Sequence, residues 1–253
     1  MELDEAALEV ARIEYPDLNV VHYIRALDHH AATIADRAGD LSDGERFIET
    51  TNAYLFGDLN LRGNNDDYYN AHNSLLNCVL DTGLGLPITL SLIYIEIARR
   101  LAKPVTGIGL PGHFVIYYDD GDYSTYVDPF HGGALLDIAG CCELAQVERL
   151  SPDLLAPADR RSIIMRIVNN LRNAYFSRQE PVKAERVLQL LIAANPASPE
   201  EHKQLGVALL QQERMADSLK AFQHYLELFP GAPDRDAVQE QIRNVVRWLA
   251  SRN

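Results

Sequence analysis

The chain has 253 residues, of which 47% are apolar and 23% charged, a globular balance that excludes wholesale disorder. Its 23 Lys and Arg against 36 Asp and Glu give a net charge of −13, which argues against a nucleic-acid coat or an anionic-membrane binder. No apolar run reaches the roughly 18 to 20 residues of a membrane span, and no secretory segment is visible at the start. Only three cysteines occur, so we expect a protein of the reducing cytoplasm.

The N-terminal region, residues 1–60, is expected to be helical throughout. It holds 13 Asp and Glu against 4 Lys and Arg, a net charge of −9. Apolar residues recur at helical spacing, which predicts one buried face on each helix. Two such stripes are Leu3, Ala7, Leu8, Ala11 and Ile13, and Val21, Ile24, Leu27, Ala31 and Ile34. We expect the acidic residues to form a solvated face, with a docking surface for a basic partner as the alternative.

The middle of the chain changes from helical to strand-like periodicity. A polar, turn-rich segment at 61–70 precedes a short apolar helix at 73–80. Pro87 follows a glycine-containing loop and is expected in the first turn of a helix that ends near Leu101, where proline is well tolerated. Strands are then predicted at 105–110, 113–118 and 124–128, with hairpin turns between them. Helices followed by an antiparallel meander indicate an α+β class.

The C-terminal third repeats with a period of 34 residues and resembles the tetratricopeptide repeat. We expect two copies, 165–198 and 199–232, followed by a capping helix at 233–251. The corresponding residues are Leu171 and Leu205, Ala174 and Ala208, Leu188 and Phe222, and Pro196 and Pro230. The predicted organisation is therefore a helical region and core at 1–150 and an all-α repeat region at 160–253.

The middle of the chain also resembles one bacterial family, the Sir-type transglutaminase-like/TPR family, named after an invasion-gene regulator. The resemblance spans nearly the whole chain, because members of that family also end in tetratricopeptide repeats. It implies a papain-like, transglutaminase-type core with a small antiparallel sheet. The segments that carry it are Asp67-Tyr68-Tyr69, Asn73-Ser74, Gly85-x-Pro87-Ile88-x-Leu90-Ser91, Ile97-Ala98-Arg99-Arg100-Leu101, Pro111-Gly112-His113-Phe114 and Asp128-Pro129-Phe130-x-Gly132-Gly133.

The resemblance implies a degenerate catalytic triad. Transglutaminase-type enzymes use a Cys at the start of the core helix, a His on the next strand as base, and an Asp that orients the His. His113 and Asp128 match the His and the Asp, and we expect their side chains to be neighbours. Pro87 falls at the Cys position, so the nucleophile is missing. Members of the Sir-type family carry the same Gly-x-Pro.

Cys78, Thr89 and Ser91 are the candidates for a replacement nucleophile. Cys78 is interpreted as a buried structural thiol, and Cys141 and Cys142 as core or near-core thiols without metal-ligand spacing. The hydroxyls of Thr89 and Ser91 are expected to satisfy local backbone groups, with a nucleophilic role as the alternative.

The remaining candidate residues border a possible cleft. His113 is expected to be structural or ligand-holding, with a catalytic base as the alternative. The candidate binding residues are Tyr68, Tyr69, Asn73, Gly112, His113, Phe130 and His131. His113, Asp128 and His131 form the one conceivable metal set, but the sequence offers no fourth spaced ligand, so we expect neither a metal nor another cofactor.

Three functions remain in competition on these observations. The first is a non-catalytic transglutaminase-like domain, a pseudoenzyme, whose repeats make it a protein-interaction or regulatory module with a protein or peptide partner. The second is an atypical hydrolase or acyl-transferase that uses the His113–Asp128 pair with an unrecognised nucleophile. The third is a structural subunit whose repeats bind only its own core. The sequence predicts no nucleic-acid or membrane partner.

Overall fold

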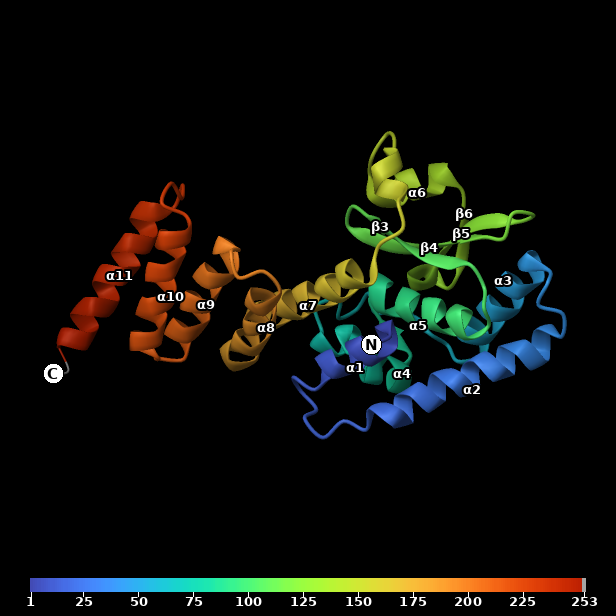
Figure 1. Cartoon of the computed structure of the whole chain (residues 1–253), viewed down its shortest axis with the longest axis horizontal. Helices are drawn as coiled ribbons and strands as arrows, with labels where there is room; N and C mark the ends of the chain where they lie inside the picture. Colours follow the sequence, from blue (N-terminus) through green and yellow to red (C-terminus); the bar gives the residue numbers. More distant parts are fainter. Residues whose placement is uncertain (252–253) are drawn as a thin grey trace. The chain divides into compact units, whose positions relative to one another are not determined.

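The computed structural model describes residues 1–251 and divides into two compact units, Met1–Ile167 and Val168–Asn253 (Figure 1). The first unit combines helices with a small sheet, and the second is made of helices. The architecture is α+β, as the sequence predicts. No helix within residues 1–251 is long and apolar enough to cross a membrane.

The N-terminal region is helical, in agreement with its apolar spacing. Its elements are α1 (Leu3–Ala11), α2 (Val20–Ala38), α3 (Gly44–Asn52) and the π-helical turn η1 (Ala53–Asp58). Asn19 caps α2 by accepting a hydrogen bond from the backbone N–H of His22 at 3.2 Å. The buried stripe of α2 begins at Leu27, whereas Val21 is 57% exposed. The predicted stripe was therefore wrong at its first residue.

One acidic residue of this region departs from the solvated face that we expected. Asp4 on α1 is buried and lies 2.5 Å from the guanidinium of Arg100. Arg100 also pairs with the buried carboxylate of Glu96 at 2.9 Å and with Asp28 at 2.7 Å. Burial alone would raise the pKa of Asp4, but the hydrogen bond and charge of Arg100 outweigh it and lower that pKa. A buried charge is tolerable here because it is paired, and the pairing joins α1 and α2 to the central helix.

The central helix α5 (Pro87–Arg100) and a four-stranded antiparallel sheet form the core of the first unit. The strands lie in the order β3 (Val105–Leu110), β4 (His113–Asp119), β5 (Ser124–Asp128) and β6 (Ala134–Leu136). Helix α5 packs on β3 and β4, and α6 (Ile138–Ala145) lies on the other side of the sheet. The sequence predicted three of the strands but not β6 or α6. The remaining short elements are β1 (Arg62–Gly63), η2 (Ala71–Ser74), α4 (Leu76–Thr82), β2 (Leu84–Gly85), η3 (Pro129–His131) and η4 (Pro152–Leu155).

The start of α5 matches the sequence expectation closely. Pro87 is its first residue, where a missing N–H costs no helical hydrogen bond. The Thr89 hydroxyl accepts a hydrogen bond from the N–H of Leu86 at 2.9 Å and donates to the carbonyl of Asn73 at 2.7 Å. This hydroxyl therefore satisfies local backbone groups, as predicted.

Helix α7 (Arg160–Ser177) belongs to both units, because the boundary falls within it. The residues just before α7 and in its first half contact β3 and β4. Ala158 donates its N–H to the carbonyl of Gly107 at 2.8 Å, and Ile163 is buried. These contacts explain why the first unit extends to Ile167. The proposed division at residues 150 and 160 stays a prediction.

The second unit consists of antiparallel helices with the predicted 34-residue recurrence. Beyond α7 they are α8 (Pro181–Ala194), α9 (Pro199–Gln211), α10 (Met215–Leu228) and α11 (Arg235–Ala250). A Cβ on Gly206 would lie 2.7 Å from the ring of Phe222, so α9 and α10 cross closely only because this residue is glycine. The Ser218 hydroxyl donates to the carbonyl of Gly206 at 2.7 Å at the same crossing. On α11, Val238 and Val245 are buried, but Val246 is 46% exposed and was wrongly included in the apolar face.

Candidate functional site

The predicted contact between His113 and Asp128 is present. His113 is the first residue of β4 and Asp128 the last residue of β5, and both are buried. The His113 ring nitrogen Nε2 lies 3.0 Å from each carboxylate oxygen of Asp128. Gly112 forms the turn before His113 with φ +69°, a backbone conformation that favours glycine. The β3–β4 hairpin thus places the imidazole of His113 next to the end of β5.

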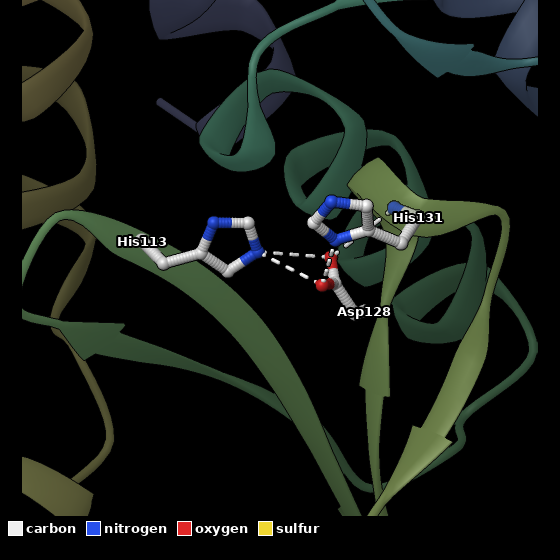
Figure 2. Close-up of side chains that lie close together, drawn as sticks. All are labelled: His113, Asp128 and His131. Atoms are coloured by element: carbon white, nitrogen blue, oxygen red, sulfur yellow. Dashed lines mark hydrogen bonds and ion pairs between the residues drawn. The ribbon is translucent and has the colours of Figure 1, made fainter. Parts of the chain in front are cut away.

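Asp128 is the centre of this site because it also binds His131 and the following backbone (Figure 2). Its Oδ2 lies 2.6 Å from Nδ1 of His131. Its Oδ1 accepts the backbone N–H of Phe130 at 3.0 Å and that of His131 at 3.4 Å, so it caps the turn η3. Burial alone would raise the pKa of Asp128, but the hydrogen bonds and charges of both histidines lower it.

The loop after Asp128 is held by two glycines in the left-handed region. Gly132 has φ +69° and Gly133 φ +78°, which reverses the chain into β6. A Cβ on Gly133 would lie 2.5 Å from the ring of Phe56, and its carbonyl accepts a hydrogen bond from the Asn52 side chain at 2.9 Å. The loop that carries His131 is thereby tied to the N-terminal helices.

Arg166 is a residue of the site that sequence reasoning missed. It lies on α7 and donates to the carbonyl of His113 at 2.8 Å, while its guanidinium lies 5.5 Å from the centre of the Phe114 ring. Burial lowers its pKa. The repeat pattern places position 166 in the first repeat, 165–198, and so does not predict its contact with β4.

Aromatic side chains line one side of the His113–Asp128 pair. Phe130 is buried, with its ring centre 5.9 Å from that of His113 and 6.1 Å from that of Tyr68. Tyr68 is 38% exposed, and Tyr69 beside it is 62% exposed. Tyr68, Phe130 and His131 therefore adjoin the pair, whereas Tyr69 lies further out on the surface.

Asn73, another candidate, is used inside the loop that precedes α4. It is buried, and its amide donates to the carbonyls of Asp67 at 2.7 Å and Tyr68 at 3.1 Å. Its side-chain oxygen accepts a hydrogen bond from Asn64 at 2.9 Å. These bonds stabilise the loop that carries Tyr68, so Asn73 has a structural role.

No nucleophile is in hydrogen-bond contact with His113 in the described part of the chain, where its ring bonds only to Asp128. Cys78 instead donates to the hydroxyl oxygen of Tyr15 at 3.3 Å. Cys141 is packed in the core between the sheet and α6. Ser91 is fully buried on α5, and among the described residues its hydroxyl has no hydrogen-bond partner, so the expectation that it bonds to local backbone groups was wrong.

Three groups of the site are arranged as metal ligands could be. One ligand atom each from His113, Asp128 and His131 lies within 4.8 Å of the others. The chemistry open to the cluster is therefore of two kinds. The carboxylate can orient an imidazole as a base, or the three groups can hold an ion.

The thiols should be slow to alkylate at neutral pH, because only a thiolate reacts. Burial raises the pKa of Cys78, and burial with nearby negative charge raises that of Cys141 to about 11. Iodoacetamide labelling followed by peptide mass spectrometry should show Cys141 reacting faster only as the pH rises toward that value. Cys142, the partly exposed thiol, should react first. Fast labelling of Cys78 near pH 7 that is lost in His113→Ala would instead indicate an activated thiol.

Fold and site together define a transglutaminase-like core that keeps a His–Asp pair and is followed by tetratricopeptide-type helices. Comparison with known proteins agrees: the model of the transglutaminase-like superfamily matches residues 21–169, and a tetratricopeptide repeat model matches 171–243. The chain belongs to the transglutaminase-like superfamily.

Several relatives align with most of this chain. A UPF0162 protein of Xylella fastidiosa (strain Temecula1) is 34% identical over 94% of this chain and 87% of its own length. UPF0162 protein YchA of Escherichia coli is 21% identical over 94% of this chain and 90% of its own. Human F-box only protein 21 is 29% identical over 58% of this chain and 26% of its own. No solved structure matches the chain significantly.

Proposed function

We propose that this protein is a non-catalytic member of the transglutaminase-like superfamily that acts as a protein-interaction module. The observation that carries this proposal is Pro87, the first residue of α5, at the position where the related enzymes carry a cysteine. A helix N-terminus lowers the pKa of a thiol placed there, but proline offers no side chain to activate. The finer assignment to the Sir-type family is part of the proposal and rests on the sequence motifs.

Two further contacts support a non-catalytic role. The hydroxyl of Thr89, two residues after Pro87, is fully buried and hydrogen-bonded to the backbone of Leu86 and Asn73. The two oxygens of Asp128 are shared between two imidazoles and a turn, so the carboxylate holds the hairpin ends together. A hub of this kind stabilises the fold whether or not a nucleophile is present.

The interaction role rests on the helical repeats. Tetratricopeptide-type helices commonly present side chains to peptide or protein partners, and the second unit exposes several apolar residues. These are Val182, Leu190, Val207, Phe229 and Val246, from 37% to 53% exposed. We propose a protein or peptide partner in the cytoplasm that buries part of this apolar surface.

Affinity capture with the purified full chain tests the proposal. The bait should retain partners from a cell extract, and Val207→Asp together with Val246→Asp should lower their recovery at least ~10-fold, since a buried carboxylate costs far more than 1.4 kcal/mol. Val21→Asp, at a more exposed valine of α2, is the control and should retain them. Equal recovery by wild type and the double variant would contradict a role for the repeats.

The alternative function is an enzyme that uses the His113–Asp128 pair. It is favoured by one observation, the 3.0 Å bond that orients the imidazole as in a triad. Covalent probes for activated serine and cysteine nucleophiles distinguish the two functions. Labelling of a single residue that disappears in His113→Ala would establish the enzyme, whereas no His113-dependent labelling is expected of an interaction module.

A further inference from the structure

A cluster of two imidazoles and one carboxylate lies at the end of β5, and nothing in the proposed interaction function requires it. We propose that His113, Asp128 and His131 form a binding site for a divalent transition-metal ion of the zinc class. The sequence-based expectation of no metal rested on the lack of a fourth spaced ligand. Sites with three protein ligands and water at the remaining position are, however, an established class.

The geometry is close to that of a metal site. Zinc binds imidazole nitrogen at about 2.0–2.1 Å and carboxylate oxygen at about 2.0–2.2 Å, which places tetrahedral ligand atoms roughly 3.3 Å apart. Here Asp128 Oδ2 lies 3.0 Å from His113 Nε2 and 2.6 Å from His131 Nδ1. All three atoms lie within 4.8 Å of one another. An ion therefore needs Asp128 Oδ2 to move about 0.3 Å away from His113 Nε2 and about 0.7 Å away from His131 Nδ1, with the two nitrogens brought to a similar spacing.

Of the ligands, His131 has the side chain that can move most easily to admit an ion. His131 sits in the turn η3, and its side chain is 51% exposed, whereas that of Asp128 is 1% exposed. The two imidazole rings are near-parallel, with centres 5.6 Å apart (Figure 2). Figure 2 shows both rings directed at the same carboxylate. The exposed side leaves room for water at the remaining coordination positions.

The surroundings hold two of the ligands in place. Asp128 Oδ1 accepts the N–H of Phe130, and Oδ2 faces the two ring nitrogens that would be its fellow ligands. Arg166 holds the main chain of His113 through its carbonyl. Such outer contacts fix the orientation of metal ligands and typically change affinity about 10–100-fold. The donor set of two nitrogens and one oxygen favours zinc, cobalt, nickel or copper over magnesium and calcium, which prefer all-oxygen sites.

Metal binding replaces the hydrogen bonds between the carboxylate and the two imidazoles. An ionised carboxylate can only accept hydrogen bonds, so without a metal the nitrogens that face it, Nε2 of His113 and Nδ1 of His131, act as donors. The ion takes the lone pairs of those two nitrogens. The displaced protons go to the opposite nitrogen of each ring, exchanging through solvent, and no oxidant or reductant is involved.

Titration of the untagged full chain with Zn²⁺ against a chromophoric chelator tests the proposal. We expect one tight site per chain, and Co²⁺ bound in its place should give the visible absorption of a cobalt ion with nitrogen and oxygen ligands. His131→Ala removes an exposed ligand and should weaken Zn²⁺ binding at least ~100-fold, more than the loss of an outer contact. Its thermal unfolding shows whether the fold is retained.

The matched control is His224→Ala. His224 lies 4.5 Å, ring centre to ring centre, from His202, so this pair is a competing place for an ion. The control should bind Zn²⁺ as the wild type does. Absence of a tight site, or binding that His131→Ala leaves unchanged, would overturn the proposal. Asp128→Asn is a second test variant, in which the shape of the side chain is kept. It should also abolish the cobalt spectrum. These metal-binding measurements use no partner protein, so their outcome does not depend on whether the proposed interaction function is correct.

Discussion

Replacement of Asp128 by alanine is expected to lower the free energy of unfolding of the first unit by about 3–5 kcal/mol, as when one partner of a buried charged pair is removed. The change leaves the buried His113 ring without its acceptor and the N–H of Phe130 without its cap. Both groups would then be buried and unsatisfied, which is the costly part of losing a hydrogen-bonded carboxylate.

Hydrogen exchange of the metal-free protein measures this effect locally. The amides of β4 and β5 should exchange faster in Asp128→Ala, because they open with the unit that the carboxylate holds together. Asp122→Ala is the matched control, since Asp122 is exposed in the β4–β5 turn and such a change usually costs at most ~0.5 kcal/mol. Similar protection in both variants would show that the histidines find other partners.

Phe222→Ala should be comparably damaging in the second unit, at about 3–5 kcal/mol. Phe222 is buried against Gly206 at the crossing of α9 and α10. The cavity would lie at the centre of the repeat, and the apolar contacts with Tyr225 and Val238 would be lost with it.

The single tryptophan of the chain, Trp248, lies on α11 and reports on this unit. Its fluorescence during urea unfolding should shift to lower denaturant in Phe222→Ala. Phe229→Ala is the matched control, because Phe229 is 42% exposed and its loss should move the midpoint little. An unchanged midpoint for Phe222→Ala would mean that the helices close over the cavity. The stability of each unit is measured with its own probe, because a chain of two units need not unfold in one step.

Local sequence patterns predicted much of the fold. Pro87 marks the start of α5 because proline tolerates the first turn of a helix, and the strands at 105–110 and 113–119 follow from their apolar runs and the glycine turn between them. The 34-residue recurrence located the helices of the second unit, since each repeat must place the same small and large residues at its crossings. Motif resemblance then paired His113 with Asp128, which lie 15 positions apart on adjacent strands.

Other features exist only once the chain is folded. Arg166 reaches His113 from a helix 53 residues later, and Asp4 meets Arg100 across 96 residues. His131 meets Asp128 because η3 turns the chain there; the sequence named the two residues as members of a conceivable metal set but did not predict this hydrogen bond. Periodicity reports which face of one element is buried, because that face follows from the geometry of the element itself. Which charged groups meet depends on how separate elements pack, and that information is distributed over the whole core rather than over any short segment.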